Sequence, residues 1–155
     1  MILRQWRPAL TGAGDRSAQA TAMPEITVRL VGALLALAIA SVHVADQGGI
    51  TSLNSPEWLG WSFRIVEAGG VITAFTLLLR RTAWLGWSAG LLLGLGPFLG
   101  YLTTRSIGLP GDAGDVGNWG YWTGTVSLII EAALVVLSAA TLIAGWRSAP
   151  FRENR

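Results

Sequence analysis

Residues 82–104 read TAWLGWSAGLLLGLGPFLGYLTT, a stretch without a single charged side chain. A helix that crosses the hydrocarbon core of a bilayer needs about 20 mostly apolar residues, because it rises about 1.5 Å per residue. This stretch meets that requirement. It therefore predicts a transmembrane helix and makes lipid the solvent for this part of the chain.

Three further apolar stretches are long enough to cross a membrane, and each carries at most two charges. They cover residues 28–45, 59–79 and 121–145. Arg29 lies at the edge of the first stretch, where its long side chain can reach the headgroups. The sequence thus predicts an all-α polytopic membrane protein, a bundle of four transmembrane helices.

The composition agrees with lipid as the solvent. Only 13% of the 155 residues are charged, 52% are hydrophobic, and the mean hydropathy is +0.50, whereas about 25% of residues are charged in an ordinary soluble domain. The chain has no cysteine and one histidine, which excludes disulfides, cysteine-ligated metals and a bis-histidine haem. No catalytic, phosphate-binding or dinucleotide motif is present, and nothing indicates nucleic-acid binding.

Arginine placement predicts the orientation in the membrane. All eleven basic residues are arginine, a bias typical of high-GC bacterial genomes. Nine of them flank the spans on one side, which the positive-inside rule assigns to the cytoplasm. We expect both termini in the cytoplasm of a bacterium and two acidic loops outside its cytoplasmic membrane. A flexible N-terminal tail (1–26), a membrane domain (27–147) and a C-terminal tail (148–155) would result.

Two alternatives at the N-terminus stay open. Met23 is a second possible start of translation. Residues 38–40 (AIA) resemble a small-residue cleavage site that follows an apolar run, as in a signal peptide. Cleavage there would leave three spans with unchanged orientation.

The second and fourth spans resemble each other. Residues 58–61 (WLGW) and 119–122 (WGYW) open them, and residues 65–68 (IVEA) and 129–132 (IIEA) follow. A duplicated hairpin is one explanation, and chance similarity between common membrane residues is the other. The tryptophans fit an interfacial aromatic belt. Either way, one glutamate falls at a matching position in each span.

Glycines recur in the third span at a spacing that suits helix packing. Gly86, Gly90 and Gly94 are four residues apart, and Gly96 and Gly100 are four apart on another face. Small residues at this spacing let helix backbones approach closely in lipid. The third helix is therefore predicted to be the packed centre of the bundle or to contact a second copy or another membrane-complex partner.

Charged residues within spans are costly and usually have a partner. Arg64 and Glu67 are three residues apart on one helix face and are expected to form an ion pair. His43 and Asp46 have the same spacing, so the carboxylate is a candidate for orienting the imidazole. Glu131 has no local partner.

Glu131 is therefore the position where function or specific packing is most expected. Across the bundle it could pair with Arg64 or Arg105, or it could carry a proton. Together with His43 and Glu67 it could also bind a divalent metal through nitrogen and oxygen ligands, such as zinc or manganese. Glu67 and Glu131 sharing a proton is a further hypothesis. No other cofactor is predicted.

The loop between the third and fourth spans has glycine at every third position from 108 to 120. This pattern predicts an extended, turn-rich loop with small side chains. Its most distinctive residues are Gly108, Pro110, Asp112, Asp115 and Trp119. A solvated acidic loop is favoured over calcium binding, because the spacing differs from that of an EF-hand.

Residues 101–111 (YLTTRSIGLPG), 117–119 (GNW) and 127–131 (SLIIE) resemble uncharacterised small four-helix integral membrane proteins of high-GC bacteria. The resemblance covers roughly residues 28–146 and lends no chemistry. It implies joint importance for Arg105, Gly108, Pro110, Trp119 and Glu131. A contact between Arg105 and Glu131 near the outer surface would follow from it.

The sequence favours a non-enzymatic accessory or binding component of a membrane process, because it shows isolated intramembrane charges and no catalytic constellation. A small transporter or a metal- or proton-handling protein that uses His43 and the two buried glutamates is the first alternative. A subunit of a membrane oxidoreductase without its own redox centre is the second.

Overall fold

The computed structural model describes the backbone of residues 13–148 and the side chains of residues 25–147. This part of the chain is all-helical, with four long helices and no β-strand. The long helices are α1 (Ala13–Asp46), α2 (Glu57–Leu78), α3 (Ala83–Ser106) and α4 (Trp122–Ser148). Each is long and apolar enough to cross a membrane, so the predicted all-α class with four such helices is confirmed.

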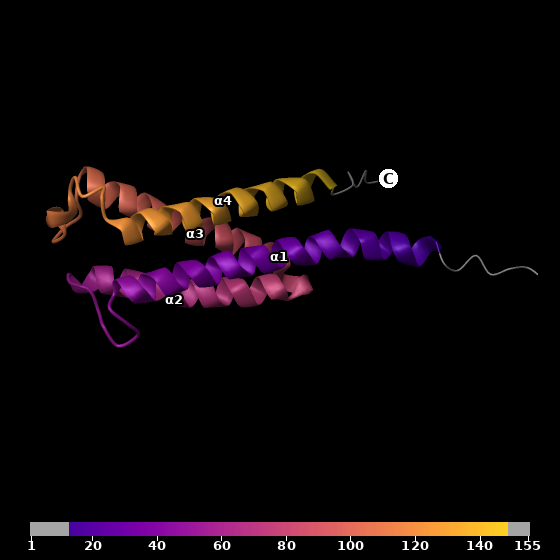
Figure 1. Ribbon diagram of the computed structural model, residues 1–155, viewed down its shortest axis with the longest axis horizontal. Coiled ribbons are helices and arrows are strands. Elements are labelled where there is room, and N and C mark those ends of the chain that lie inside the picture. Colours follow the sequence, from indigo (N-terminus) through magenta and orange to yellow (C-terminus); the bar gives the residue numbers. More distant parts are fainter. Residues whose placement is uncertain (1–12, 149–155) are drawn as a thin grey trace, which may run out of the picture.

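The helices form two antiparallel hairpins that lie side by side (Figure 1). The α1–α2 and α3–α4 loops lie at one end of the bundle, and the short α2–α3 connection lies at the other. That connection is the 3₁₀ turn Arg80–Thr82. Neighbouring helices contact each other, but no residue of α2 comes within 8 Å (Cα–Cα) of α4. The helices α2 and α4 therefore stand diagonally across the bundle, because each of them contacts α1 and α3 instead.

Close helix contacts depend on residues without a side chain. A Cβ atom at Gly70 of α2 would lie 2.6 Å from the carbonyl oxygen of Ala36 in α1, and one at Gly94 of α3 would lie 2.8 Å from the carbonyl oxygen of Glu131 in α4. Both distances are too short for any real side chain, so these glycines set the α1–α2 and α3–α4 separations.

The glycines of α3 divide into two groups. Positions 86 and 90 lie, like Gly94, against neighbouring helices, where a Cβ would approach Leu77 or Ser138 to within 3 Å. Gly96 and Gly100, expected to pack in the same way, have no atom of another helix within 4 Å of a Cβ. They line the cavity described below, so there is open space beside them.

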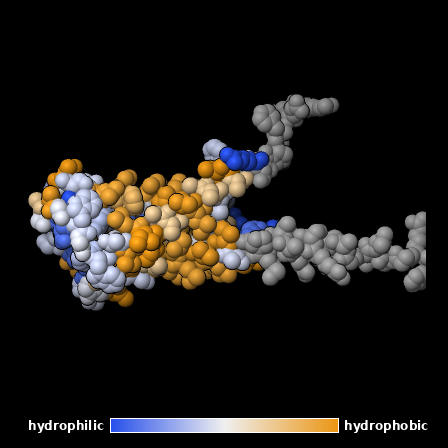
Figure 2. Space-filling view, turned by 45° about the horizontal axis from the view of Figure 1, so that its top comes forward, coloured by the Kyte–Doolittle hydropathy of each residue, from blue (hydrophilic) through white to orange (hydrophobic). Residues whose placement is uncertain are grey.

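The outside of the bundle is apolar over most of its length. Leu92, Ile65 and Val136 are each more than 60% exposed. Figure 2 shows this apolar band between the polar loop end and the charged residues at the opposite end. Large apolar side chains exposed in such number are expected where lipid covers the surface.

The first helix extends beyond the predicted first span at its N-terminal end. The helix α1 begins at Ala13, so residues 13–26, predicted as part of a flexible tail, have a helical backbone. The stretch is rich in alanine, which favours helix more than any other residue, and it continues directly into the first apolar span. The remainder of the predicted N-terminal tail and nearly all of the C-terminal tail lie outside the described residues.

Candidate functional site

A cavity of about 870 Å³ lies among the four long helices, toward the end of the bundle that carries the α3–α4 loop. It reaches from the α3–α4 loop, at Asp112 and Asn118, down to Glu131, and all four long helices line it. Gly96 and Gly100 form part of its wall, which explains their open surroundings. The volume falls in the range of about 300–1,000 Å³ that is typical of small-molecule sites.

Glu131 lies at the base of this cavity and is only 1% exposed. The hydroxyl of Ser127, one helical turn earlier, donates a hydrogen bond of 2.5 Å to its Oε1. Its Oε2 has no hydrogen-bond partner among the described residues. A buried carboxyl group thus has one of its two oxygens unsatisfied, which is rare in folded proteins.

His43 of α1 approaches Glu131 from the other hairpin. Its Nε2 lies 4.0 Å from Oε1 of Glu131, and its Nδ1 lies 2.9 Å from the carbonyl oxygen of Ile39. A carbonyl only accepts, so Nδ1 carries the hydrogen of that bond, and in the neutral imidazole Nε2 is a free acceptor. The edge of Phe63 packs against the ring, with centroids 4.9 Å apart.

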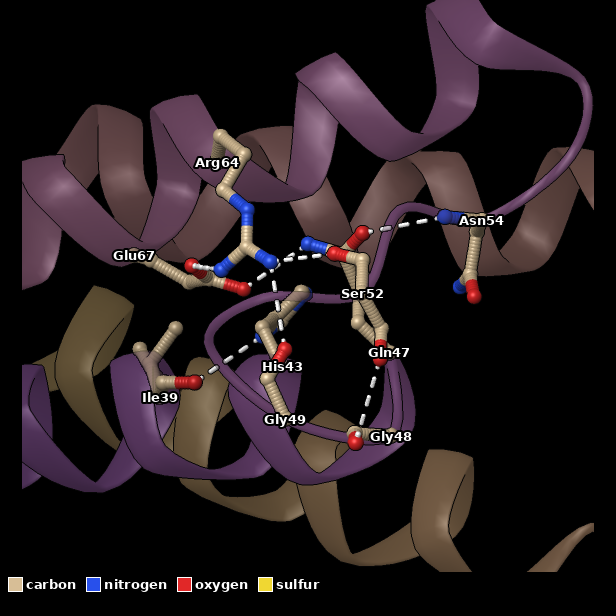
Figure 3. A network of polar contacts seen from close by, with 9 residues as sticks. All are labelled: Ile39, His43, Gln47, Gly48, Gly49, Ser52, Asn54, Arg64 and Glu67. Carbon is tan, nitrogen blue, oxygen red and sulfur yellow. Dashed lines mark hydrogen bonds and ion pairs between the residues drawn. The ribbon is translucent and has the colours of Figure 1, made fainter.

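Glu67, the matching glutamate of α2, has a different environment (Figure 3). Its Oε2 lies 2.5 Å from Nη1 of Arg64, and its Oε1 accepts a hydrogen bond of 2.9 Å from Nε2 of Gln47. Gln47 in turn accepts from the backbone N–H of Asn54 through its side-chain oxygen, at 3.1 Å. Both carboxylate oxygens of Glu67 are therefore satisfied.

Arg64 ties the same cluster to the α1–α2 loop. Its Nη2 donates to the carbonyl oxygens of Gly49, at 3.1 Å, and Ser52. The loop thus folds back over α2 and places backbone acceptors around the guanidinium (Figure 3). The ion pair expected from the three-residue spacing is present, and the loop encloses it.

Arg105 stands at the mouth of the cavity. It forms an ion pair with Asp115 of the α3–α4 loop, and its guanidinium lies 4.8 Å from the ring centre of Tyr101 and 5.6 Å from that of Tyr121. The expected contact between Arg105 and Glu131 is therefore wrong. The loop folds back to bring an acid to Arg105, and Glu131 lies deeper in the bundle.

The α3–α4 loop is compact. Gly108, Gly111 and Gly117 have φ values near +80°, a conformation that glycine adopts at no steric cost. The carbonyl oxygen of Pro110 accepts from the indole N–H of Trp58 at 3.1 Å. These turns reverse the loop over the cavity in place of the extended path that was expected.

Two further contacts hold this loop in place. Trp119 packs edge-to-face on Tyr101, with centroids 6.3 Å apart. The hydroxyl of Tyr121 donates to the carboxylate of Asp46 at the end of α1, and this hydrogen bond raises the pKa of Tyr121. Asp46 therefore does not orient His43, whose Nδ1 is bound to its own helix backbone.

Asp112, the other acid of the α3–α4 loop, has a raised pKa. Partial burial raises its pKa first, and the like charge of Asp115 raises it further, although Arg105 acts in the opposite direction. Both acids line the cavity. The mouth therefore concentrates negative charge.

The three side chains considered as metal ligands do not assemble. His43 and Glu131 approach each other, but Glu67 is engaged by Arg64 and Gln47. Within residues 25–147 no group of three His, Asp or Glu side chains is placed to hold a metal ion. Within the same residues no hydrogen bond joins Glu67 to Glu131.

Sequence reasoning missed several residues around the site. Gln47 and Phe63 belong to no motif, and Tyr101 and Tyr121 lie in stretches that were singled out for other reasons; only the helix arrangement brings these side chains to the cavity or to its neighbouring cluster. Ser127 had a usable signal, because it precedes Glu131 by four residues and so lies on the same helix face. Neither protein-family models, nor curated proteins, nor solved structures yield a match to this chain.

Proposed function

We propose that the protein is an integral protein of a bacterial cytoplasmic membrane, with four transmembrane helices and both termini in the cytoplasm. The four long apolar helices and the exposed apolar band support the membrane location. The arginine distribution supports the orientation. In this orientation the α1–α2 and α3–α4 loops face outward, and the cavity opens toward the outer side of the membrane.

Within the membrane the protein acts as a non-enzymatic binding component. The observation that carries this proposal is the cavity of about 870 Å³ with a buried, half-satisfied carboxyl group at its base. Ligand sites typically combine apolar walls with a few convergent polar groups, and this cavity has that character. Its exposed apolar border at Ile65 and Leu92 gives amphipathic molecules a path from the lipid.

Cysteine labelling tests the orientation without background, because the chain has no native cysteine. Gly114→Cys places a thiol in the exposed α3–α4 loop, and Arg81→Cys places one in the α2–α3 connection. A membrane-impermeant maleimide added to intact cells should label the first variant and not the second. The reverse pattern would overturn the orientation.

Cavity access is tested with a second pair of variants. Gly100→Cys places a thiol in the wall of the cavity, where there is open space, and Ala74→Cys places one in a buried helix interface. The same reagent should label the first and spare the second. Failure to label Gly100→Cys in a folded, correctly inserted protein would remove the basis for a binding role.

A small proton- or cation-handling transporter is the second candidate. The approach of His43 to Glu131 favours it, because two titratable groups from different hairpins meet inside the membrane domain. Proteoliposomes separate the two candidates. A transporter would dissipate an imposed pH or cation gradient, and a binding component would leave the gradient intact.

A further inference from the structure

The charges that line the cavity favour a cationic occupant. Four carboxyl groups and one guanidinium border it. These residues are Asp46, Asp112, Asp115, Glu131 and Arg105. Arg105 is engaged by Asp115, which leaves three acids in excess. A cleft lined by one sign of charge with low-dielectric walls concentrates ions of the opposite sign.

The base of the cavity lacks hydrogen-bond donors. Oε2 of Glu131 has no partner among the residues whose side chains are described. Nε2 of His43 is an acceptor in the neutral imidazole, and it is 4.0 Å from Oε1 of Glu131, too far for a hydrogen bond. Two acceptors thus lie close together on side chains that are almost fully buried. A ligand that carries N–H groups and a positive charge would satisfy both.

The surroundings fit an organic cation better than a metal ion. Only two candidate metal ligands meet here, whereas metal sites normally use three or more protein ligands. The walls above them include aromatic and aliphatic side chains such as Phe63, Tyr101 and Leu93. Aromatic faces attract organic ammonium ions, and aliphatic walls accept their apolar part.

We propose that the cavity binds a lipophilic organic ammonium ion, with its N–H groups donated to Oε2 of Glu131 and Nε2 of His43. The apolar part of the ion lies against the aromatic and aliphatic walls of the cavity. The inference rests on the proposed binding function and adds the class of ligand. Glu131 supplies the charge that selects an ammonium ion over a neutral molecule of the same shape.

The test uses a matched pair of probes, 1-naphthylmethylammonium and the neutral 1-naphthalenemethanol. Isothermal titration calorimetry with the purified full-length protein in detergent measures both affinities. The wild-type protein should bind the ammonium ion and bind the alcohol at least about tenfold more weakly. Glu131→Gln should weaken ammonium binding about tenfold to a hundredfold, since a hydrogen bond to a charged group contributes about 1.5–3 kcal/mol.

Glu67→Gln is the matched control, because it makes the same chemical change in a glutamate outside the cavity. It should leave ammonium affinity within about twofold of wild type. His43→Leu, which removes the second acceptor, should weaken ammonium binding severalfold. Its elution volume in size-exclusion chromatography should equal that of the wild type, which shows that the variant is folded. This variant keeps the proposal testable if Glu131→Gln fails to fold.

Equal affinity for the ammonium ion and the alcohol would overturn the proposal. Equal ammonium affinity in wild type and Glu131→Gln would do the same. Absence of ammonium binding in a protein whose Gly100→Cys variant is labelled from outside would overturn the ligand class and leave the binding function standing. Absence of that labelling would overturn the binding function itself.

Discussion

Glu67 and Glu131 occupy matching positions in the second helices of the two hairpins, and their environments differ. Glu67 receives hydrogen bonds on both oxygens, from Arg64 and Gln47. Glu131 receives one, from Ser127. A buried carboxylate with a full set of donors stabilises the fold around it, whereas one with a free oxygen is available to a ligand. The comparison distinguishes an acid whose partners are all within the fold from one that we propose binds a ligand.

The two outer loops account for the difference. The α1–α2 loop folds back over α2 and adds backbone and side-chain partners to the Arg64–Glu67 pair. The α3–α4 loop is held at the mouth of the cavity by Arg105 and Asp115. It therefore sends no donor to Glu131, which lies deeper along its helix. The cavity therefore lies beside Glu131, whereas Arg64 and Gln47 surround Glu67 in the first hairpin.

Removing Arg64, the cation that pairs with Glu67, should have the largest effect on stability. Arg64→Met eliminates the ion pair with Glu67 and both hydrogen bonds to the loop. We expect a loss of about 2–4 kcal/mol in the free energy of unfolding, because a largely buried carboxylate loses its counter-charge. Reversible unfolding in mixed micelles, followed by circular dichroism, measures it. A loss below about 0.5 kcal/mol would mean that the cluster is not structural.

Two nearby glycines of α3, one packed against Glu131 and one facing open space, offer a matched pair of intermediate effect. Gly94→Ala places a Cβ against the carbonyl oxygen of Glu131, so α3 and α4 must separate, at a cost of about 1–3 kcal/mol. Gly96→Ala adds a methyl group to the cavity wall and should be neutral or stabilising by up to about 1 kcal/mol, since alanine favours helix. Equal destabilisation by both substitutions would contradict the open cavity. The same unfolding assay applies.

The smallest effect is expected where the α3–α4 loop is tied to α1. Tyr121→Phe removes the hydrogen bond to Asp46. Because this bond raises the pKa of Tyr121 above its ordinary value of 10.0, its contribution is complete below pH 10 and is lost as the pH rises through the raised pKa. Wild type should therefore exceed the variant slightly in stability at pH 8, and the difference should disappear in stronger alkali. A pH-independent difference would exclude this bond as its cause.

The sequence was sufficient for what depends on local pattern. Long apolar runs with few charges predicted the four helices, and the three-residue spacing predicted the Arg64–Glu67 pair. The sequence raised a meeting of His43 and Glu131 only as one hypothesis, because this contact joins α1 to α4 and depends on how the two hairpins pack. The partner of Arg105 was missed because the turns of the α3–α4 loop bring Asp115 back over the helix end.

The central claim is that one buried glutamate holds the fold together and the other is kept free for a ligand. Its most direct test is the unfolding free energy of Glu67→Gln and Glu131→Gln, measured side by side in the same micelles without added ligand. We predict that Glu67→Gln loses about 1.5–3 kcal/mol, because a charge-assisted network is broken. Glu131→Gln should lie within about 0.5 kcal/mol of wild type, because its amide can still accept from Ser127. A loss for Glu131→Gln as large as that for Glu67→Gln would contradict the account.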